Sequence, residues 1–316
     1  MENVPSAYLD LNIFDRIEKI ETLENEVKAN YLSLRQKIEN KQLFTAYSNA
    51  HINDLFRGYQ KNPTYVEGHL KNIEYLTNNN CVCQYWNQSN VVFHKRNIFE
   101  FFNEKNKEWE FETETYDELI SDVPLLRMQA ELKKNIPLPE NFKKGYSEPV
   151  FALMFPLSKI YNNQYSLEAD LYAFQNKFKS DYSLYKTIKK FLALSLKKLK
   201  NNQGFTAALR NQFKDLPKHL DLTDIYDVFT PNTKTGNNVM YSKILETFYK
   251  FDLAGYKTDS NFNNMFDDSL HTFYAAHFDY FITNDERCRY KAQKTYNKLG
   301  ILTQVITSNE ISKIEI

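Results

Sequence analysis

The chain of 316 residues lacks several features that mark common protein classes. It has no net charge, because 40 Lys and Arg residues balance 40 Asp and Glu residues, so any attraction to nucleic acid or to a membrane surface must be local. Only seven glycines are present, which argues against Gly-rich phosphate-binding loops. No stretch approaches the roughly 18 consecutive apolar residues that a membrane-spanning helix needs.

Cysteine is equally scarce. The three cysteines, Cys81, Cys83 and Cys288, form an odd and sparse set, and no basic, apolar leader precedes them at the N-terminus. Both observations favour a reducing compartment, so we predict a soluble, cytoplasmic protein without membrane association. The Cys81-x-Cys83 pair has no second cysteine pair nearby, which makes it a weak zinc motif.

Apolar residues, by contrast, are plentiful. The chain is 42% hydrophobic and 15% aromatic, which suffices for a packed interior and for one large or two modest domains. An apolar residue recurs every three or four positions over residues 14–40, and this spacing predicts an amphipathic helix. The stripe consists of Ile17, Ile20, Leu23, Val27, Tyr31, Leu34 and Ile38.

The order acid, helix, strand, acid appears near the C-terminus. Asp267, Asp268 and His271 precede an apolar run, residues 278–283 predict a buried strand, and Asp285 follows that strand. In an open α/β sheet the binding crevice lies outside the carboxyl ends of the strands. A helix that runs into a parallel strand begins at the same edge. We therefore expect Asp268, as the opening residue of that helix, to meet Asp285 across one cleft.

A second pair of acids lies in the N-terminal part. Asp10 interrupts the apolar run of residues 7–13, and a buried carboxylate is costly unless it is paired or binds a metal. Asp10 therefore either points into the same cleft or caps the helix that follows.

Residues 43–47 predict a second strand, followed by a short helix that Ser48 caps and Gly58 ends. Ser48, His51 and Asp54 follow at steps of three, so their side chains share one helical face.

Three motifs in this order resemble the PIN-domain superfamily of metal-dependent nucleases. They are Tyr8-Leu9-Asp10-Leu11-Asn12, then Asp54-Leu55-Phe56-Arg57-Gly58, and finally Asp268-Ser269-Leu270-His271 through Thr283-Asn284-Asp285. The resemblance implies an α/β fold with a three-layer α/β/α core and a parallel sheet. It covers residues 1–60 and 260–316, which we predict to form one discontinuous nuclease domain. Residues 61–259 would then be a mostly α-helical insertion.

The same resemblance implies a site and a chemistry. Mg²⁺ or Mn²⁺ would be held by the four acids, and the metal-activated site would hydrolyse RNA phosphodiester bonds. The expected metal ligands are Asp10, Asp54, Asp268 and Asp285. The expected positioning residues are Asn12, Ser48, His51, His271 and Thr283. The expected substrate-binding residues are Arg57, Arg287 and Lys291.

Two features depart from the family pattern or leave a choice open. Asp54 stands where the family usually has Glu, so its reach to a metal is shorter. Asp267 competes with Asp268, but the Asp-x-x-His spacing places Asp268 and His271 on one helical face.

The insertion carries its own patterns. Residues 61–80 are polar and predict a loop, 81–86 and 91–94 predict two short strands, and 166–199, 205–213 and 239–254 predict helices. The lysines of 177–200 would offset repulsion between the acids and substrate phosphates, or simply form a solvated face, which is the commoner case. After Asp285, the sequence predicts a helix over 287–299 and a last strand over 302–307.

Other functions remain open at this stage. The chain is either an RNA-cutting toxin or defence effector, with room for an inhibitory protein partner, or a catalytically weak PIN-like scaffold that binds a protein or nucleic-acid partner through its helical insertion. Single-stranded DNA is an alternative substrate, because the same chemistry cuts it.

Overall fold

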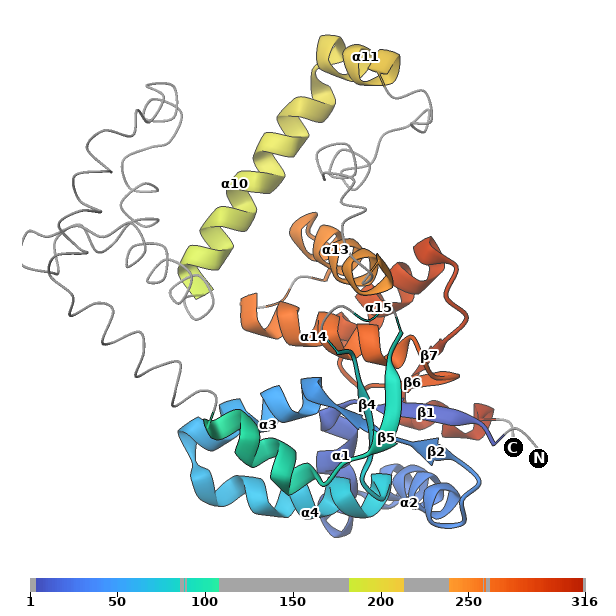
Figure 1. Cartoon of the computed structure of the whole chain (residues 1–316). Helices are drawn as coiled ribbons and strands as arrows, with labels where there is room; N and C mark the ends of the chain where they lie inside the picture. Colours follow the sequence, from blue (N-terminus) through green and yellow to red (C-terminus); the bar gives the residue numbers. More distant parts are fainter. Residues whose placement is uncertain are drawn as a thin grey trace, which may run out of the picture. The chain divides into compact units, whose positions relative to one another are not determined.

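The computed structural model describes residues 4–85, 88, 90–107, 182–212, 239–257, 259 and 262–314 (Figure 1). The chain divides into two compact units, one of residues 1–105, 189–259 and 264–316, the other of residues 106–188 and 260–263. Every predicted site residue belongs to the first unit. That unit also contains residues 61–105 and 189–259, which the sequence had assigned to the insertion.

The N-terminal part alternates short strands with helices. Its elements are β1 (Ser6–Leu9), α1 (Leu11–Glu18), the 3-10 helix η1 (Ile20–Thr22), α2 (Asn25–Glu39), β2 (Phe44–Thr45), β3 (Tyr47–Ser48), α3 (Asn49–Lys61), η2 (Pro63–Tyr65), α4 (Val66–Thr77), β4 (Asn80–Cys83) and β5 (Val92–Lys95).

The C-terminal part is mainly helical. Its elements are α10 (Tyr182–Asn201), α11 (Gln203–Gln212), α13 (Val239–Leu253), α14 (Phe262–Ala275), β6 (Tyr280–Ile282), α15 (Glu286–Leu299), β7 (Gln304–Ile306) and η4 (Ser308–Lys313). Among the described helices, none is long and apolar enough to cross a membrane.

The central element is a four-stranded parallel sheet in the order β2-β1-β6-β7. β1 and β6 are far apart in sequence but adjacent in the sheet, with Leu9 paired to Ile282. Helices α1 and α2 connect β1 to β2, and α15 connects β6 to β7, as parallel pairing requires. The prediction of an α/β fold with a parallel sheet is confirmed.

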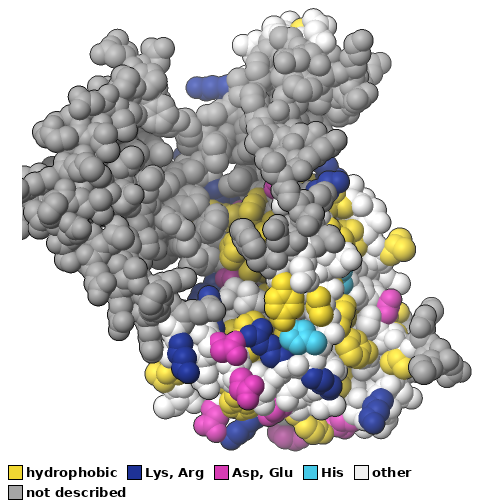
Figure 2. All heavy atoms as spheres, viewed as in Figure 1, with side chains coloured by type: hydrophobic (Ala, Val, Ile, Leu, Met, Phe, Trp, Pro, Cys, Tyr) yellow, Lys and Arg dark blue, Asp and Glu magenta, His cyan; other side chains and the backbone are white. Residues whose placement is uncertain are grey.

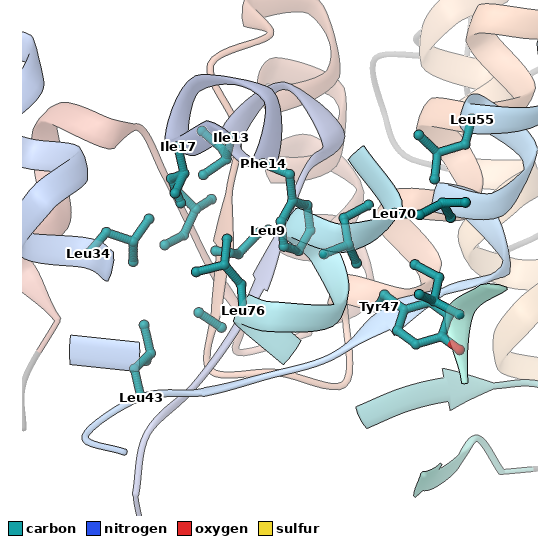
Figure 3. Packing of buried hydrophobic residues seen from close by; sticks show 14 of the residues in the cluster. Leu9, Ile13, Phe14, Ile17, Leu34, Leu43, Tyr47, Leu55, Leu70 and Leu76 are labelled. Carbon is teal, nitrogen blue, oxygen red and sulfur yellow. The ribbon is translucent and has the colours of Figure 1, made fainter. Parts of the chain in front are cut away.

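Alternate residues of the central strands face two separate hydrophobic cores. Leu9 and Ile282 belong to the first core, whereas Tyr8 and Phe281 belong to the second, because successive side chains of a strand point to opposite faces. Helices α1 to α4 cover the first core, whose packing Figure 3 shows, and α13, α14 and α15 supply side chains to the second. Helices thus lie on both faces of the sheet.

A smaller sheet joins the first unit in the order β3-β4-β5, with β3 and β4 parallel and β4 and β5 antiparallel. The single strand predicted over residues 43–47 is wrong, because the chain changes sheets at Ala46: β2 pairs with β1, and β3 pairs with β4. The two strands predicted around residues 81–86 and 91–94 are confirmed as β4 and β5.

Four other local predictions need correction. The helix predicted over residues 14–40 breaks between α1 and α2, where no glycine or proline marks the break. The loop predicted over 61–80 contains α4, whose buried Leu70, Ile73 and Leu76 form an apolar stripe at a spacing of three. Helix α3 continues through Gly58 to Lys61.

The fourth correction concerns Asp268, which does not open its helix but lies in the second turn of α14. The helices predicted within 205–213, 239–254 and 287–299 are confirmed as α11, α13 and α15, and the last strand as β7. Helix α10 confirms the part of the 166–199 prediction from residue 182 onward, and residues 166–181 lie outside the described ranges.

Candidate functional site

Asp10 and Thr283 follow directly after two neighbouring strands, β1 and β6, at the carboxyl edge of the parallel sheet. The Thr283 hydroxyl donates a hydrogen bond of 2.5 Å to Asp10 Oδ2, and the Asn12 amide donates another of 2.5 Å to the same oxygen. Asp10 is only 8% exposed. Burial raises the pKa of Asp10, although His271 and the bond from Thr283 oppose this rise.

Asp285 lies two residues beyond Thr283 and is the N-cap of α15. Its Oδ1 accepts hydrogen bonds from the backbone amides of Arg287 at 2.7 Å and Cys288 at 2.9 Å. Its own amide donates to Thr283 Oγ1 at 3.1 Å. Asp285 is exposed, and so is Arg287 two residues further along the chain. Asp285 therefore caps α15 while its carboxylate remains open to solvent.

Asp54, on α3, is held by two cationic or proton-donating side chains. Its Oδ2 accepts from His271 Nε2 at 2.9 Å, and its Oδ1 pairs with Arg57. Arg57 also contacts Asp267 Oδ2 at 2.5 Å. Burial alone would raise the pKa of Asp54, but His271 and Arg57 together hold it below its ordinary value. In the structure Arg57, which the sequence predicted to bind substrate, pairs instead with the carboxylates of Asp54 and Asp267.

A buried network lies beneath Asp54. The Tyr8 hydroxyl contacts His271 Nδ1 at 2.8 Å and Ser48 Oγ at 2.6 Å. Burial lowers the pKa of His271, but the hydrogen bond and the charge of Asp54 outweigh it, so that pKa is raised. His271 therefore links the Asp54 carboxylate to the interior of the sheet through Tyr8.

His51 plays a different part in the same network. Its Nε2 contacts the Leu9 carbonyl at 2.7 Å, so this nitrogen carries the proton. Its Nδ1 accepts from the Ser48 amide at 3.0 Å, completing a capping box at the start of α3. Burial lowers the pKa of His51 to about 3, so the ring is neutral. His51 fixes the start of the helix that carries Asp54.

Asp268 and Asp267 are adjacent on α14 but have different neighbours. Burial raises the pKa of Asp268 well above its ordinary value, and the charges of Asp259, Asp10 and Asp285 add to the rise. Burial also raises the pKa of Asp267, to about 7, against the attraction of Arg57. Asp268 thus interacts electrostatically with Asp10 and Asp285, whereas Asp267 pairs with Arg57. This arrangement favours Asp268 over Asp267 as a metal ligand.

Lys291 on α15 is fully buried and is held by two aspartates. Its ammonium lies 2.9 Å from Asp252 Oδ1 and pairs with Asp259, and it lies 4.6 Å from the centre of the Phe248 ring. Lys189 also contacts Asp252, at 2.9 Å. An ammonium enclosed in this way has no free path to a substrate. The burial argues against the phosphate-binding role predicted for Lys291 and indicates that it joins α13 to α15.

The donor set of the acid cluster, which we define as Asp10, Asp54, Asp268 and Asp285, fits a hard cation. Carboxylate, hydroxyl and amide oxygens are the ligands that Mg²⁺ and Mn²⁺ prefer. In the described part of the chain, however, no three of these acids have oxygens within 4.8 Å of one another. A Mg²⁺ ion held here would therefore contact at most two of these carboxylates and complete its shell with waters.

The raised pKa values predict that the metal-free protein loses stability as pH rises. A carboxyl that holds its proton more tightly when folded favours the native state less as pH increases, here from the ordinary Asp value of about 4 to about 7 for Asp267. His271 acts in the same direction, because its raised pKa stabilises the fold below about 6.5 and that contribution is lost above. The lowered pKa of Asp54 changes the stability of the fold only below about pH 4.

His51, whose pKa is lowered to about 3, acts in the opposite direction below about pH 6.5. We therefore expect the melting temperature in EDTA to fall between pH ~6.5 and ~8, and the fall to be shallower in Asp267→Asn. Each pKa unit removed corresponds to about 1.4 kcal/mol. Melting curves by circular dichroism measure both slopes. A wild type whose melting temperature rises over this range would contradict the raised pKa values of Asp267 and His271. A variant with the same slope as the wild type would contradict the raised pKa of Asp267.

Comparisons of the chain with protein-family models, with curated proteins and with solved structures gave no match.

The structure also contains site residues that sequence analysis had not assigned. Tyr8 connects His271 to Ser48 through its hydroxyl. The only sequence signal for this role was a hydroxyl-bearing side chain within an apolar strand. Asp252 and Asp259 enclose Lys291, and neither stands in a motif that pairs it with a residue of α15.

Proposed function

We propose that the chain is a metal-dependent endoribonuclease that resembles the PIN-domain superfamily. The proposal rests chiefly on one observation: Asp10 follows β1 and Asp285 follows β6, so both acids lie at the carboxyl edge of neighbouring parallel strands, and their charges help to raise the pKa of Asp268 on α14. A group of like charges at such an edge is the arrangement that a divalent cation stabilises.

In this account Asp10 and Asp268 would hold the cation directly, and Asp285 would hold it through water. Asp54, both of whose oxygens already contact Arg57 or His271, acts through water. A bound Mg²⁺ or Mn²⁺ would activate a water molecule and stabilise the negative charge of the phosphate.

The remaining residues orient these acids or the substrate. Thr283 and Asn12 fix the Asp10 carboxylate, and His271 fixes Asp54. Arg287 is exposed beside Asp285, and its guanidinium would pair with a neighbouring phosphate of the nucleic acid. RNA is the substrate that the family resemblance implies, with single-stranded DNA as the alternative.

The test is cleavage of end-labelled RNA and single-stranded DNA by the full chain, each with Mg²⁺, Mn²⁺ or EDTA. We expect RNA products with either metal and none with EDTA. Cutting of DNA alone would change the substrate class, and cutting that persists in EDTA would contradict the metal mechanism. Absence of cutting on a mixed RNA pool would favour the second candidate, a catalytically weak scaffold that binds a partner through residues 61–259.

A further inference from the structure

Two cysteines and a histidine meet on the small sheet, away from the acid cluster. Cys81 and Cys83 are two residues apart on β4, so their side chains point to the same face. His94 on β5 is the cross-strand partner of Cys81 and shares that face. The two sulfur atoms are 3.3 Å apart, and the sulfurs and one ring nitrogen all lie within 4.8 Å of one another.

The cysteines of this group are reduced, and its histidine has a polar neighbour. Cys81 and Cys83 are buried and form no disulfide. The Tyr85 hydroxyl contacts His94 Nε2 at 3.2 Å, which leaves Nδ1 as the available ring nitrogen. A ligating histidine usually bonds through its second nitrogen to such an outer partner.

We propose that Cys81, Cys83 and His94 bind a zinc ion. Two sulfur ligands and one imidazole suit Zn²⁺, whereas the hard cations Mg²⁺ and Mn²⁺ prefer oxygen. Two thiolates neutralise the charge of the ion, and the two thiol protons pass to solvent as it binds. Three protein ligands leave one tetrahedral position, which water fills beside the partly exposed His94.

The place of the site suggests its effect on the fold. β5 lies at the edge of the small sheet, and its Val92 and Phe93 are 36% and 44% exposed. In Figure 2, hydrophobic side chains and a histidine reach the surface over this region. An exposed edge strand is stabilised when it is linked to its neighbour, and a zinc ion would link β5 to the buried β4.

The experiment uses the full chain, purified without a histidine tag and without chelator. We expect about one zinc per chain by elemental analysis, and Co²⁺ replacement should give the intense thiolate-to-metal absorption of a tetrahedral site. His94→Gln is the first variant, because His94 is only partly buried and its replacement should fold. It should lower zinc affinity at least about tenfold, while His277→Gln, a histidine outside the cluster, should not.

Three results would overturn the proposal. The first is zinc no higher than background, with no cobalt absorption on titration. The second is zinc content unchanged in Cys83→Ser. The third is a Cys81–Cys83 disulfide in the freshly isolated protein, shown by loss of two titratable thiols. None of these readouts depends on cleavage, so failure of the zinc site and failure of the nuclease proposal are distinguishable.

Discussion

Asp268→Asn should lower the rate of RNA cleavage at least about 100-fold, since in the proposed mechanism it removes a charge that would hold the metal and so stabilise the transition state. The same change should leave the melting temperature of the metal-free protein unchanged or raise it. Burial and the charges of Asp259, Asp10 and Asp285 all oppose ionisation of Asp268. A neutral amide of the same shape removes that repulsion, so the variant should lose activity without losing stability.

Asp267→Asn is the matched control, because it makes the same chemical change one residue earlier on α14. Its side chain pairs with Arg57 rather than with Asp10 and Asp285, so we expect a much smaller loss of cleavage. Single-turnover rates at saturating Mn²⁺, with melting curves of the same samples, provide both measurements. The reverse ranking would assign the metal to Asp267, and an unfolded Asp268→Asn would mark Asp268 as structural.

Lys291→Met should destabilise the protein by about 3 kcal/mol, because it removes the cation that buried Asp252 and Asp259 share. The Lys291 ammonium contacts both Asp252 and Asp259, and all three side chains are nearly or fully inaccessible to solvent. For a chain of this size that loss corresponds to a fall of roughly 5 °C in melting temperature. Chemical denaturation gives the free energy directly.

Lys294→Met provides the control, since Lys294 is exposed on the same helix and its loss should cost under about 0.5 kcal/mol. Adding Asp259→Asn to Lys291→Met should recover part of the lost stability, because one unpaired charge is removed. If Lys291→Met instead kept wild-type stability and lost cleavage, Lys291 would act on the substrate rather than join α13 to α15.

The strands and helices that carry the acids were largely predictable, because their signals are local. The apolar run of residues 278–283 and the helix that follows Asp285 appear directly in the sequence, and the structure has both as β6 and α15. Ser48 likewise caps α3 as predicted. Each of these features depends on residues close to one another along the chain, so a single sequence reveals them.

Features that depend on distant partners were not predictable. The break between α1 and α2 carries no glycine or proline, so only tertiary packing places it. Lys291 looked like a substrate contact because cations surround it in sequence, yet its partners lie on elements 32 and 39 residues away. Cys81 and Cys83 looked like a poor metal motif until strand pairing brought His94 beside them. Spacing along the chain does not report such pairings.

The central claim is that the acid cluster holds a divalent cation, and Mn²⁺ binding to the full chain tests it most directly. Titration followed by electron paramagnetic resonance should show one or two bound ions in the wild type, fewer in Asp10→Asn and Asp268→Asn, and an unchanged number in His94→Gln. Equal binding in the wild type and in both aspartate variants, or no binding at all, would contradict the claim.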